Sequence, residues 1–392
     1  MGNRVLPCFF YLLLLLRFAP LSCSQSQQSC DSSDLNALQD FVEGLQSSDL
    51  GWSFNESSSS SDCCTWVGIS CDLGSVSVKR VIGLDLSNKS LKALSLLLWV
   101  YEHVIWTYPV ESNLPSIRLF NISANSFRGT HPIFAGSSNL SVYDVSSNSF
   151  SGPVDTGICN SSDSIQVLRF SANMLSGEFP VGFGNCSSLS KLSLDANGLT
   201  GTLPDDLFTL SSLTKLNFQG NSLSGTVKAP QPRNEFLFRS YPFRSSQLLA
   251  DAELKSWWNN LVGKIPSSFR NFTSLAMLGL YVNNFSNLFS ALQILQSLPN
   301  LTYVLLDENF RDSELMPSEG IQGFANTEFL SISDCSLSGS IPPWLANLTK
   351  LKSLDISSNY LSGRIPSWLG ILMLSFTWTS LVICSPEKFL LA

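Results

Sequence analysis

The stretch that decides the fold is LDISSNYLSGRIP, at residues 354–366. The same pattern occurs as LRFSANMLSGEFP (168–180) and LSLDANGLTGTLP (192–204). Its central asparagine recurs about every 24 residues, which indicates a stacked structural repeat. This slot is filled by Asn125, Asn148, Asn173, Asn197, Asn221, Asn259, Asn283, Asn309, Cys335 and Asn359.

Each part of the pattern has a physical role. The two leucines of LxL point inward from a short strand, and the residues between and after them face solvent. The asparagine side chain can satisfy backbone groups at the turn, which predicts a buried ladder, and Gly and Pro set the return turn. No single coil can bury its leucine face, so adjacent coils must stack. We therefore predict an α/β leucine-rich-repeat solenoid over residues 81–369, with about eleven repeats; VIGLDLSNKSL (81–91) is an early copy with Lys89 in the asparagine slot.

Two irregular stretches, 92–116 and 226–256, interrupt the period. Lys89 and Asn125 are 36 residues apart, and Asn221 and Asn259 are 38 residues apart, so each interval holds one repeat plus 12 or 14 residues. The second interval is rich in aromatic and basic residues. One interpretation is a loop that grips a ligand; the other, which we favour, is a damaged repeat. Candidate ligand contacts on the loop interpretation are Arg233, Arg239, Arg244 and Trp257.

The N-terminal residues 1–24 have the features of a secretory signal peptide. Arg4 supplies a positive charge, Phe9 to Leu16 is apolar, and small residues precede Gln25. A buried N-terminal helix is the alternative. Ten Asn-x-Ser/Thr sequons are consistent with export and glycosylation. They begin at Asn55, Asn88, Asn121, Asn139, Asn160, Asn185, Asn271, Asn284, Asn300 and Asn347.

The cysteines also favour an exported protein. Cys30, Cys63, Cys64 and Cys71 form an even set in the N-terminal region 25–80, which suits two disulfides. Zinc is the alternative, but adjacent cysteines without a nearby histidine fit it poorly. Cys159 and Cys186 are 27 residues apart, so they could stack one coil apart and form a third disulfide. Cys335 is expected to remain a buried thiol.

The hydrophobic tail, residues 370–392, departs from the repeat. Residues 365–386 contain no charge, a run of 22 residues that is long enough for a spanning helix. Its first residues belong to the preceding coil, however, and few basic residues flank it. We favour a truncated repeat over a membrane segment.

The composition argues against several functions. Charged residues are 14% of the chain and the net charge is −7, or −9 once Arg4 and Arg17 are removed with the leader, which disfavours nucleic-acid binding. Only His103 and His131 are available for histidine chemistry. No kinase motif is present. We expect no enzyme activity, no cofactor and no metal.

Residues 30–71, with the motif CCTWVGISC, resemble the N-terminal cap of plant leucine-rich-repeat receptors, and the turns LSGSIPP and LSGRIPS are typical of that group. The resemblance implies a helical cap with disulfides Cys30–Cys63 and Cys64–Cys71. Within the group, SSDLNALQDFVEGLQ and residues 283–310 and 330–345 are most similar to phytosulfokine receptors.

Those receptors are membrane kinases that bind a tyrosine-sulfated peptide on the inner solenoid surface and then a co-receptor leucine-rich-repeat kinase. The resemblance therefore implies an extracellular or plasma-membrane recognition module. The repeat register carries the ligand-lining positions over to Gly279, Tyr281, Asp307, Asp334 and Asp355. Only Asp355 matches the family residue, and carboxylates at positions 307 and 334 are expected to repel a sulfate. Further candidates on the same face are Glu308, Ser333 and Ser357.

Two other functions stay open at this stage. The chain could be a secreted defence protein that inhibits a microbial cell-wall hydrolase by covering its cleft. It could also be a gene fragment without an independent role, because its irregular segments expose apolar residues.

Overall fold

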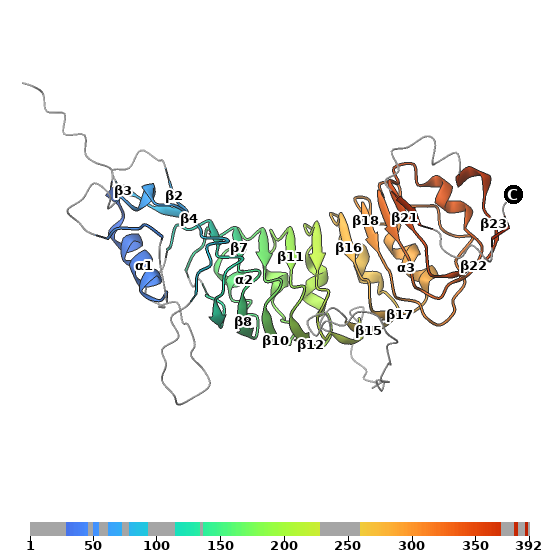
Figure 1. Ribbon diagram of the computed structural model, residues 1–392, viewed down its shortest axis with the longest axis horizontal. Coiled ribbons are helices and arrows are strands. Elements are labelled where there is room, and N and C mark those ends of the chain that lie inside the picture. The colour runs from blue at the N-terminus through green and yellow to red at the C-terminus, as the bar shows by residue number, and fades with distance from the viewer. Residues whose placement is uncertain are drawn as a thin grey trace, which may run out of the picture.

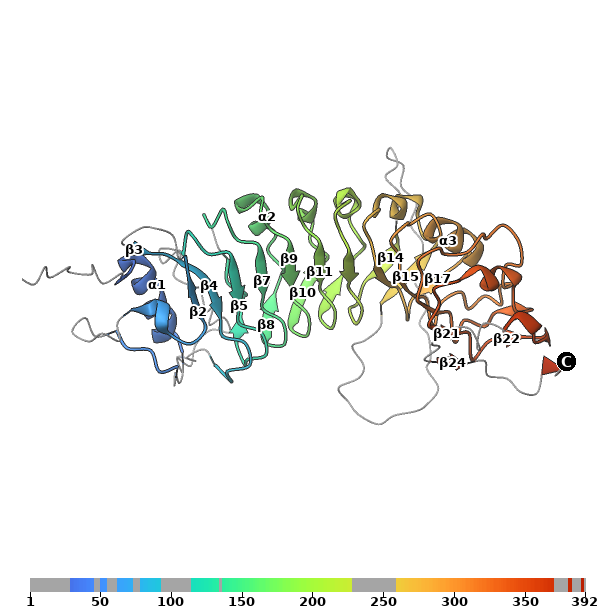
Figure 2. The same cartoon turned by 90° about the horizontal axis from the view of Figure 1, so that it is seen from above.

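The computed structural model describes residues 29–45, 50–54, 62–72, 78–92, 114–133, 136–227, 259–369, 380–382 and 389–390, and shows an elongated, curved solenoid (Figures 1 and 2). A 12-stranded sheet runs along its inner side; β2 pairs antiparallel with β4, and every other neighbouring pair is parallel. Its strands, in spatial order, are β2 (Ile69–Cys71), β4 (Val81–Asp85), β5 (Leu119–Asn121), β7 (Val142–Asp144), β9 (Val167–Arg169), β11 (Lys191–Ser193), β13 (Lys215–Asn217), β16 (Met277–Gly279), β18 (Tyr303–Leu305), β19 (Phe329–Ser331), β21 (Ser353–Asp355) and β24 (Ser380–Val382).

The strands stack in the register that the repeat predicts. Leu192 pairs with Leu168 on one side and with Leu216 on the other. These inward positions form one continuous core along the solenoid, and each is at most 2% exposed. The predicted solenoid with inward leucines is confirmed.

Outer strands and short helices complete the coils. One outer sheet contains β6 (Arg128–Gly129), β8 (Ser149–Gly152), β10 (Met174–Glu178) and β12 (Gly198–Thr200); the next contains β14 (Ser224–Thr226), β15 (Asn260–Gly263) and β17 (Asn284–Phe285). Two pairs follow, β20 (Ser338–Gly339) with β22 (Tyr360–Leu361), and β23 (Gly363–Arg364) with β25 (Phe389–Leu390). The helices are α2 (Ile158–Ser161), η2 (Phe183–Asn185), η3 (Asp205–Thr209), η5 (Ser267–Asn271), α3 (Leu288–Leu295) and η6 (Pro343–Asn347).

The asparagine ladder lies where each coil leaves its inner strand. Asn197 Nδ2 donates to Phe170 O of the preceding coil at 3.0 Å and to Leu194 O of its own coil at 3.1 Å. Its Oδ1 accepts from Leu175 N at 3.1 Å. Ala196, the residue before it, has φ +54°, which produces the turn. The ladder predicted from the sequence is confirmed, and Cys335 lies in it as a buried thiol that contacts carbonyl oxygens at 3.2 and 3.4 Å.

The N-terminal cap closes the first coil. Helix α1 (Ser32–Glu43) begins at Asp31, whose carboxylate accepts from two backbone N–H groups, and lies beside β1 (Ser29–Cys30), β3 (Val78–Lys79) and η1 (Cys63–Thr65). The expected disulfides Cys30–Cys63 and Cys64–Cys71 are present. The third, Cys159–Cys186, joins α2 to the end of η2 one coil further on.

A half-coil interrupts the solenoid between residues 217 and 277. On the ladder side three turns follow one another, because Leu223 N donates to Asn259 Oδ1 and Leu261 N donates to Asn283 Oδ1. On the strand side β13 pairs directly with β16. On the helix side η5 packs on η3, where Asn271 Nδ2 donates to Phe208 O. Among the described residues of this region, three ladder turns, at Asn221, Asn259 and Asn283, therefore correspond to two inner strands, β13 and β16.

The last described strands extend the repeat. β24 pairs in parallel with β21, and β25 pairs with β23, so both segments take the positions of a further coil. Within the described ranges, no helix is long and apolar enough to cross a membrane. The expected signal peptide, the candidate loop residues Arg233, Arg239, Arg244 and Trp257, and most of the tail lie outside the described residues.

A buried histidine couples two early coils. His131 Nε2 accepts from Asp155 N at 3.0 Å, so the proton of the neutral ring is on Nδ1, which lies 3.1 Å from Tyr143 Oη and 3.2 Å from Pro132 O. Tyr143 itself donates to Pro132 O at 2.8 Å. Burial lowers the pKa of His131, and the hydrogen bond to Pro132 O and the Asp155 carboxylate oppose this shift only in part.

We predict that acid destabilises these coils. The neutral ring is the folded form, so the stability from His131 is complete above its unfolded pKa of about 6.5 and is lost as the pH falls below that value. His131→Gln keeps an acceptor near Asp155 N but cannot be protonated. Urea unfolding midpoints between pH 7 and pH 5 should fall less steeply for this variant than for the native chain. Equal slopes for the two proteins would contradict the assignment.

Candidate functional site: the concave face

On the side of the inner sheet opposite to the leucine core, the residues form three rows that run along the solenoid. From β11 to β21, the first row holds the first residue of each strand, the second row the third residue, and the third row the residue two positions further on. The first row is Lys191, Lys215, Met277, Tyr303, Phe329 and Ser353; the second is Ser193, Asn217, Gly279, Leu305, Ser331 and Asp355; the third is Asp195, Gln219, Tyr281, Asp307, Ser333 and Ser357.

An apolar patch occupies the centre of the first row. Met277 pairs with Tyr303, and Tyr303 pairs with Phe329, so the three side chains lie side by side on the concave face. The rings of Tyr303 and Phe329 stack with centroids 4.4 Å apart and planes 6° from parallel. Leu305 extends the patch into the second row. All four are only half-buried, so the patch leaves apolar surface in contact with water.

Sequence reasoning missed this patch, although a signal was present. The middle position of LxL is solvent-facing, and it is usually polar because it is not part of the core. The position just before LxL faces outward for the same reason. Aromatic residues occupy it in two successive coils, at Tyr303 and Phe329, and this exception was visible in the sequence.

The predicted residues Gly279 and Tyr281 lie at the edge of this patch. A Cβ on Gly279 would meet Gln219 Nε2 at 1.9 Å, so the Gln219 amide covers this position from the neighbouring coil. Tyr281 is half-buried, and its pKa is raised, first by burial and then by the carboxylates of Asp195 and Asp307. The phenol therefore stays protonated and can donate a hydrogen bond into the concave surface.

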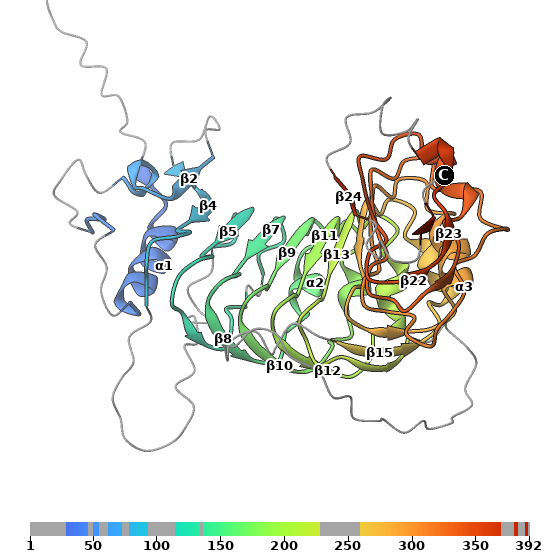
Figure 3. The same cartoon turned by 45° about the vertical axis from the view of Figure 1, so that its right-hand side comes forward.

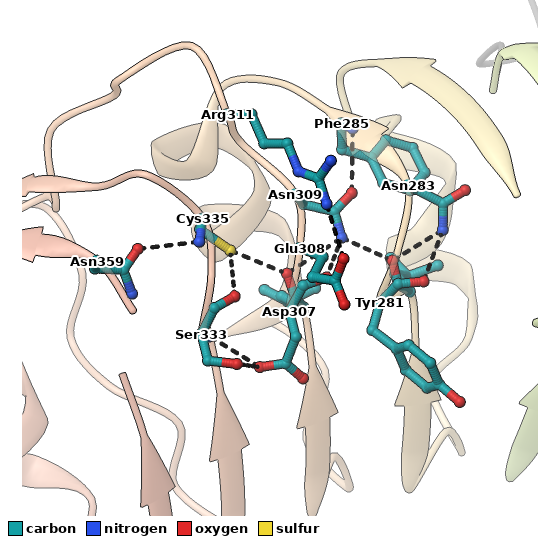
Figure 4. Close-up of polar contacts among 12 residues, drawn as sticks. Tyr281, Asn283, Phe285, Asp307, Glu308, Asn309, Arg311, Ser333, Cys335 and Asn359 are labelled. Atoms are coloured by element: carbon teal, nitrogen blue, oxygen red, sulfur yellow. Dashed lines mark hydrogen bonds and ion pairs between the residues drawn. The ribbon is translucent and has the colours of Figure 1, made fainter. Parts of the chain in front are cut away.

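The predicted residue Asp307 is already engaged by the next coil. Its Oδ1 accepts from Ser333 N at 2.8 Å, from Ser333 Oγ at 2.7 Å and from Ser331 Oγ (Figure 4). Five other coils supply such an acceptor from their own strand, through Asp or Asn at the second-row position. Ser331 stands at that position in this coil, and Asp307 of the preceding coil caps the turn instead.

The predicted residue Asp355 also has a role in the turn. Its Oδ1 accepts from Ser357 N at 3.0 Å, and the same contact recurs at Asp85, Asn121, Asp144 and Asn217. Its second carboxylate oxygen is left for other partners. The agreement with the receptor family at this position is therefore partly explained by the fold.

Asp334 lies outside the three rows. It precedes Cys335 at φ +50°, in the same turn position as Glu308, and its side chain is exposed. Ser333 and Ser357 do lie in the third row. The predicted residues thus come together on one stretch of surface, from β16 to β21, but in two different settings: strand face and turn.

The concave face changes charge along its length. Lys191 and Lys215 are neighbours on β11 and β13, and neither ammonium group has an ion pair within the described part of the chain. The coils from β18 onward carry Asp307 in the third row, Asp355 in the second row and Asp334 in a turn beside the face instead. This polarity was not predicted from the sequence, because it depends on which coils become neighbours across the half-coil.

The remaining predicted sites are distributed over the rest of the surface. The sulfur atoms of Cys30, Cys63 and Cys64 lie close together, but disulfides engage all three. Among the sequons, Asn121 is half-buried on the concave face, and Asn55 is outside the described residues. The exposed ones are Asn88, Asn139, Asn160, Asn185, Asn271, Asn284, Asn300 and Asn347.

Comparison with known proteins agrees with this architecture. The leucine rich repeat N-terminal domain matches residues 31–72, and the Leucine Rich Repeat matches residues 326–348 and 350–372. Phytosulfokine receptor 1 of Arabidopsis thaliana is 35% identical over 204 residues, which cover 49% of this chain and 20% of the receptor. Receptor-like protein 41 of the same plant is 34% identical over 113 residues, covering 29% of this chain and 13% of that protein. The chain thus spans a fifth or less of these relatives.

Solved structures show the same fold. The Arabidopsis receptor kinase HAESA, in complex with the peptide hormone IDA and the co-receptor SERK1, superposes with a TM-score of 0.57 at 24% identity, covering 86% of this chain and 47% of that one. A plant ice-binding protein superposes with a TM-score of 0.55 at 22% identity, covering 87% and 90%. The fold is therefore shared by proteins with different ligands. With its cap, ladder and repeats, the chain is a leucine-rich-repeat solenoid similar to the ectodomains of plant receptors and to plant receptor-like proteins.

Proposed function

We propose that this chain is a non-catalytic extracellular recognition module that binds a peptide on its concave face. The observation that carries the proposal is the stacked Tyr303–Phe329 pair on a solvent-facing row. A solenoid gains no core from these rings, and half-exposed aromatic surface on a concave sheet is typical of a ligand site. Similarity to phytosulfokine receptor 1 supports a receptor role, and the fold shared with HAESA, which was solved with a peptide hormone and a co-receptor, is consistent with a peptide ligand and a co-receptor kinase as second partner.

Carboxylates and serines on this face do not suggest chemistry. Asp307 and Asp355 are both hydrogen-bonded to backbone N–H groups, so they are held as acceptors and turn caps. Binding would rest on burial of the patch and on hydrogen bonds from several coils. Tyr281 Oη is one donor that is available to a peptide carbonyl.

Panning of a random dodecapeptide library tests the proposal. The full chain, secreted from plant cells, should enrich specific sequences. Tyr303→Ser combined with Phe329→Ser should weaken their binding about tenfold or more, because burial of two rings is worth over 1.4 kcal/mol. Met174→Ser removes an apolar side chain that is 66% exposed on β10, away from the inner sheet, and should leave binding unchanged.

A titration with sulfated and unsulfated phytosulfokine then asks whether the ligand is that of the relative. Binding that requires the sulfate would assign this peptide. Failure of the library to yield any binder that depends on Tyr303 and Phe329 would refute peptide recognition by the concave face.

A further inference from the structure

The order of charges along the concave face specifies the kind of peptide it would take. We propose that the ligand is a linear peptide with an acidic group at one end, an apolar or aromatic pair in the middle and basic residues at the other end. This inference rests on the proposed function and deepens it. The three parts of the ligand would lie over Lys191 and Lys215, over Tyr303 and Phe329, and over Asp355 with Asp334 in the adjoining turn.

The acidic end of the ligand is assigned by two adjacent lysines. Lys191 and Lys215 pair across β11 and β13, which places two positive charges one strand apart on the same row. Arg169 is different, because it pairs with Asp144 at 3.0 Å and is neutralised within the face. Asp195, in the third row of the β11 coil, accepts from Ser171 Oγ at 2.5 Å.

The ammonium groups of both lysines can therefore donate hydrogen bonds to an anionic group of a ligand. Asn217, in the second row beside Lys215, uses its Oδ1 to accept from Gln219 N, which leaves its amide N–H groups as additional donors. A carboxylate or a sulfate fits this chemistry equally well.

The middle of the ligand is assigned by the apolar patch. The stacked rings of Tyr303 and Phe329 form an apolar surface flanked by Met277 and Leu305. No charged side chain occupies the first or second row between Lys215 on β13 and Asp355 on β21. An aliphatic or aromatic side chain is the occupant that loses least on leaving water here.

The basic end of the ligand is assigned by carboxylates without cationic partners. Two other acidic residues nearby are neutralised, Glu328 by Lys352 at 2.7 Å and Glu308 by Arg311 at 2.9 Å. Asp334 and Asp355 have no ion pair within the described residues, and Asp307 receives only neutral donors.

This end of the face therefore carries an excess of negative charge that an arginine or lysine would satisfy. An arginine could in addition stack on the Phe329 ring.

The strand spacing gives the length of the ligand. Five steps of the inner sheet separate β11 from β21. At about 4.8 Å per step they span about 24 Å. An extended chain covers about 3.3 Å per residue, so about seven or eight residues reach from the lysines to the carboxylates. Direct pairing of β13 with β16 is what brings the basic and aromatic parts within this reach.

The probe is the octapeptide acetyl-Asp-Asp-Ser-Ile-Tyr-Ser-Arg-Arg-amide. Calorimetry with the secreted full chain at pH 7 compares it with three matched peptides, in which the acidic, apolar or basic pair is replaced by Ser-Ser. We expect about a fivefold loss for each charged pair, since exposed ion pairs are weak, and about a tenfold loss for the apolar pair. A fourth peptide with sulfotyrosine in place of one Asp separates sulfate from carboxylate recognition.

Protein variants then locate each end. Lys191→Ser with Lys215→Ser should abolish the advantage of the acidic pair and leave that of the basic pair. Asp334→Asn with Asp355→Asn should do the reverse, and asparagine keeps both the acceptor for Ser357 N and the left-handed backbone at position 334. Lys264→Ser, an exposed lysine that follows β15 outside the inner sheet, is the control and should change neither.

The possible outcomes are distinct. Library binders that depend on Tyr303 and Phe329, together with equal affinities for the charge-matched peptides, would leave the proposed function standing and overturn the charge order. Loss of both charge preferences in either double variant would also overturn it. Absence of any binding by the octapeptide, while library peptides bind, would do the same.

Discussion

Replacement of Asn197 by leucine is expected to lower the free energy of unfolding by about 3 kcal/mol or more and to reduce secretion sharply. The side chain bridges two coils: Nδ2 serves Phe170 O and Leu194 O, and Oδ1 accepts from Leu175 N. Leucine has similar volume but leaves Leu175 N without its acceptor, and Phe170 O and Leu194 O keep only their bonds from Asn173 and Asn221. A buried unpaired N–H group costs about 1–3 kcal/mol, and the two lost bonds to carbonyl oxygens add to this cost. Urea unfolding of the purified chain and the yield of secreted protein measure the effect.

Cys335 provides the matched control for this prediction. It occupies the same ladder slot, where its thiol contacts Leu306 O and Ser333 O and Asn359 Oδ1 accepts from its backbone N–H. Burial raises the pKa of this thiol to about 12, so it remains uncharged. Cys335→Asn restores the repeat residue and should leave stability unchanged or raise it. If Asn197→Leu were as harmless as Cys335→Asn, the ladder would not be what holds neighbouring turns together.

Asp34→Leu should cause the second large loss, by loosening the N-terminal cap. Asp34 is completely buried; it accepts from Arg80 Nε at 3.0 Å and Nη2 at 2.7 Å, and from Val81 N at 2.7 Å. Burial raises the pKa of Asp34, although the hydrogen bonds from Val81 and Arg80 oppose the shift. The charged carboxylate is therefore held at a desolvation cost, and its removal leaves Arg80 with only the longer ion pair to Asp31, at 3.5 Å. We expect a loss of about 3 kcal/mol, at the low end for buried pairs because Arg80 is 31% exposed.

A double variant separates the ion pair from the backbone contact. Asp34→Leu with Arg80→Met removes both charges and should recover part of the loss, because no guanidinium remains beside the apolar replacement. The residual cost reports the unpaired Val81 N–H. Thermal unfolding of the four proteins in this cycle gives the coupling energy. A double variant no more stable than Asp34→Leu would show that the pair itself contributes little.

The repeat pattern was sufficient to predict the parts of the fold that each coil specifies for itself. Inward leucines, the ladder at Asn197 and the turn before it all follow from local sequence and nearest-neighbour stacking. The contact between Asp307 and Ser333 could not be predicted in this way. It exists because Ser331 lacks the carboxylate that Asp355 supplies in its own coil, so the acceptor comes from the neighbour.

The half-coil also could not be predicted, for a related reason. Counting motifs in the sequence counts ladder turns, because the motif is aligned on the ladder asparagine. The segment around Asn259 matches the motif well. Whether a strand stands beneath that turn depends on pairing between residues 62 positions apart, such as Lys215 and Met277. The distance between the two lysines and the apolar patch on the concave face depends on this pairing. A prediction guided by ligand-lining positions of relatives named polar residues and passed over Tyr303 and Phe329.

The half-coil makes the stack wider on its turn side than on its strand side. The turn side holds an additional layer, formed by β15 and Asn259, that has no counterpart between β13 and β16. A layer added on one side only inclines the coils that follow it relative to those before it. The coils after β16 do turn away from the direction of the earlier ones (Figure 3). The concave face is then a junction between two differently inclined blocks, with the lysines on one block and the aromatic and acidic residues on the other. A ligand that touches both would hold the angle between them.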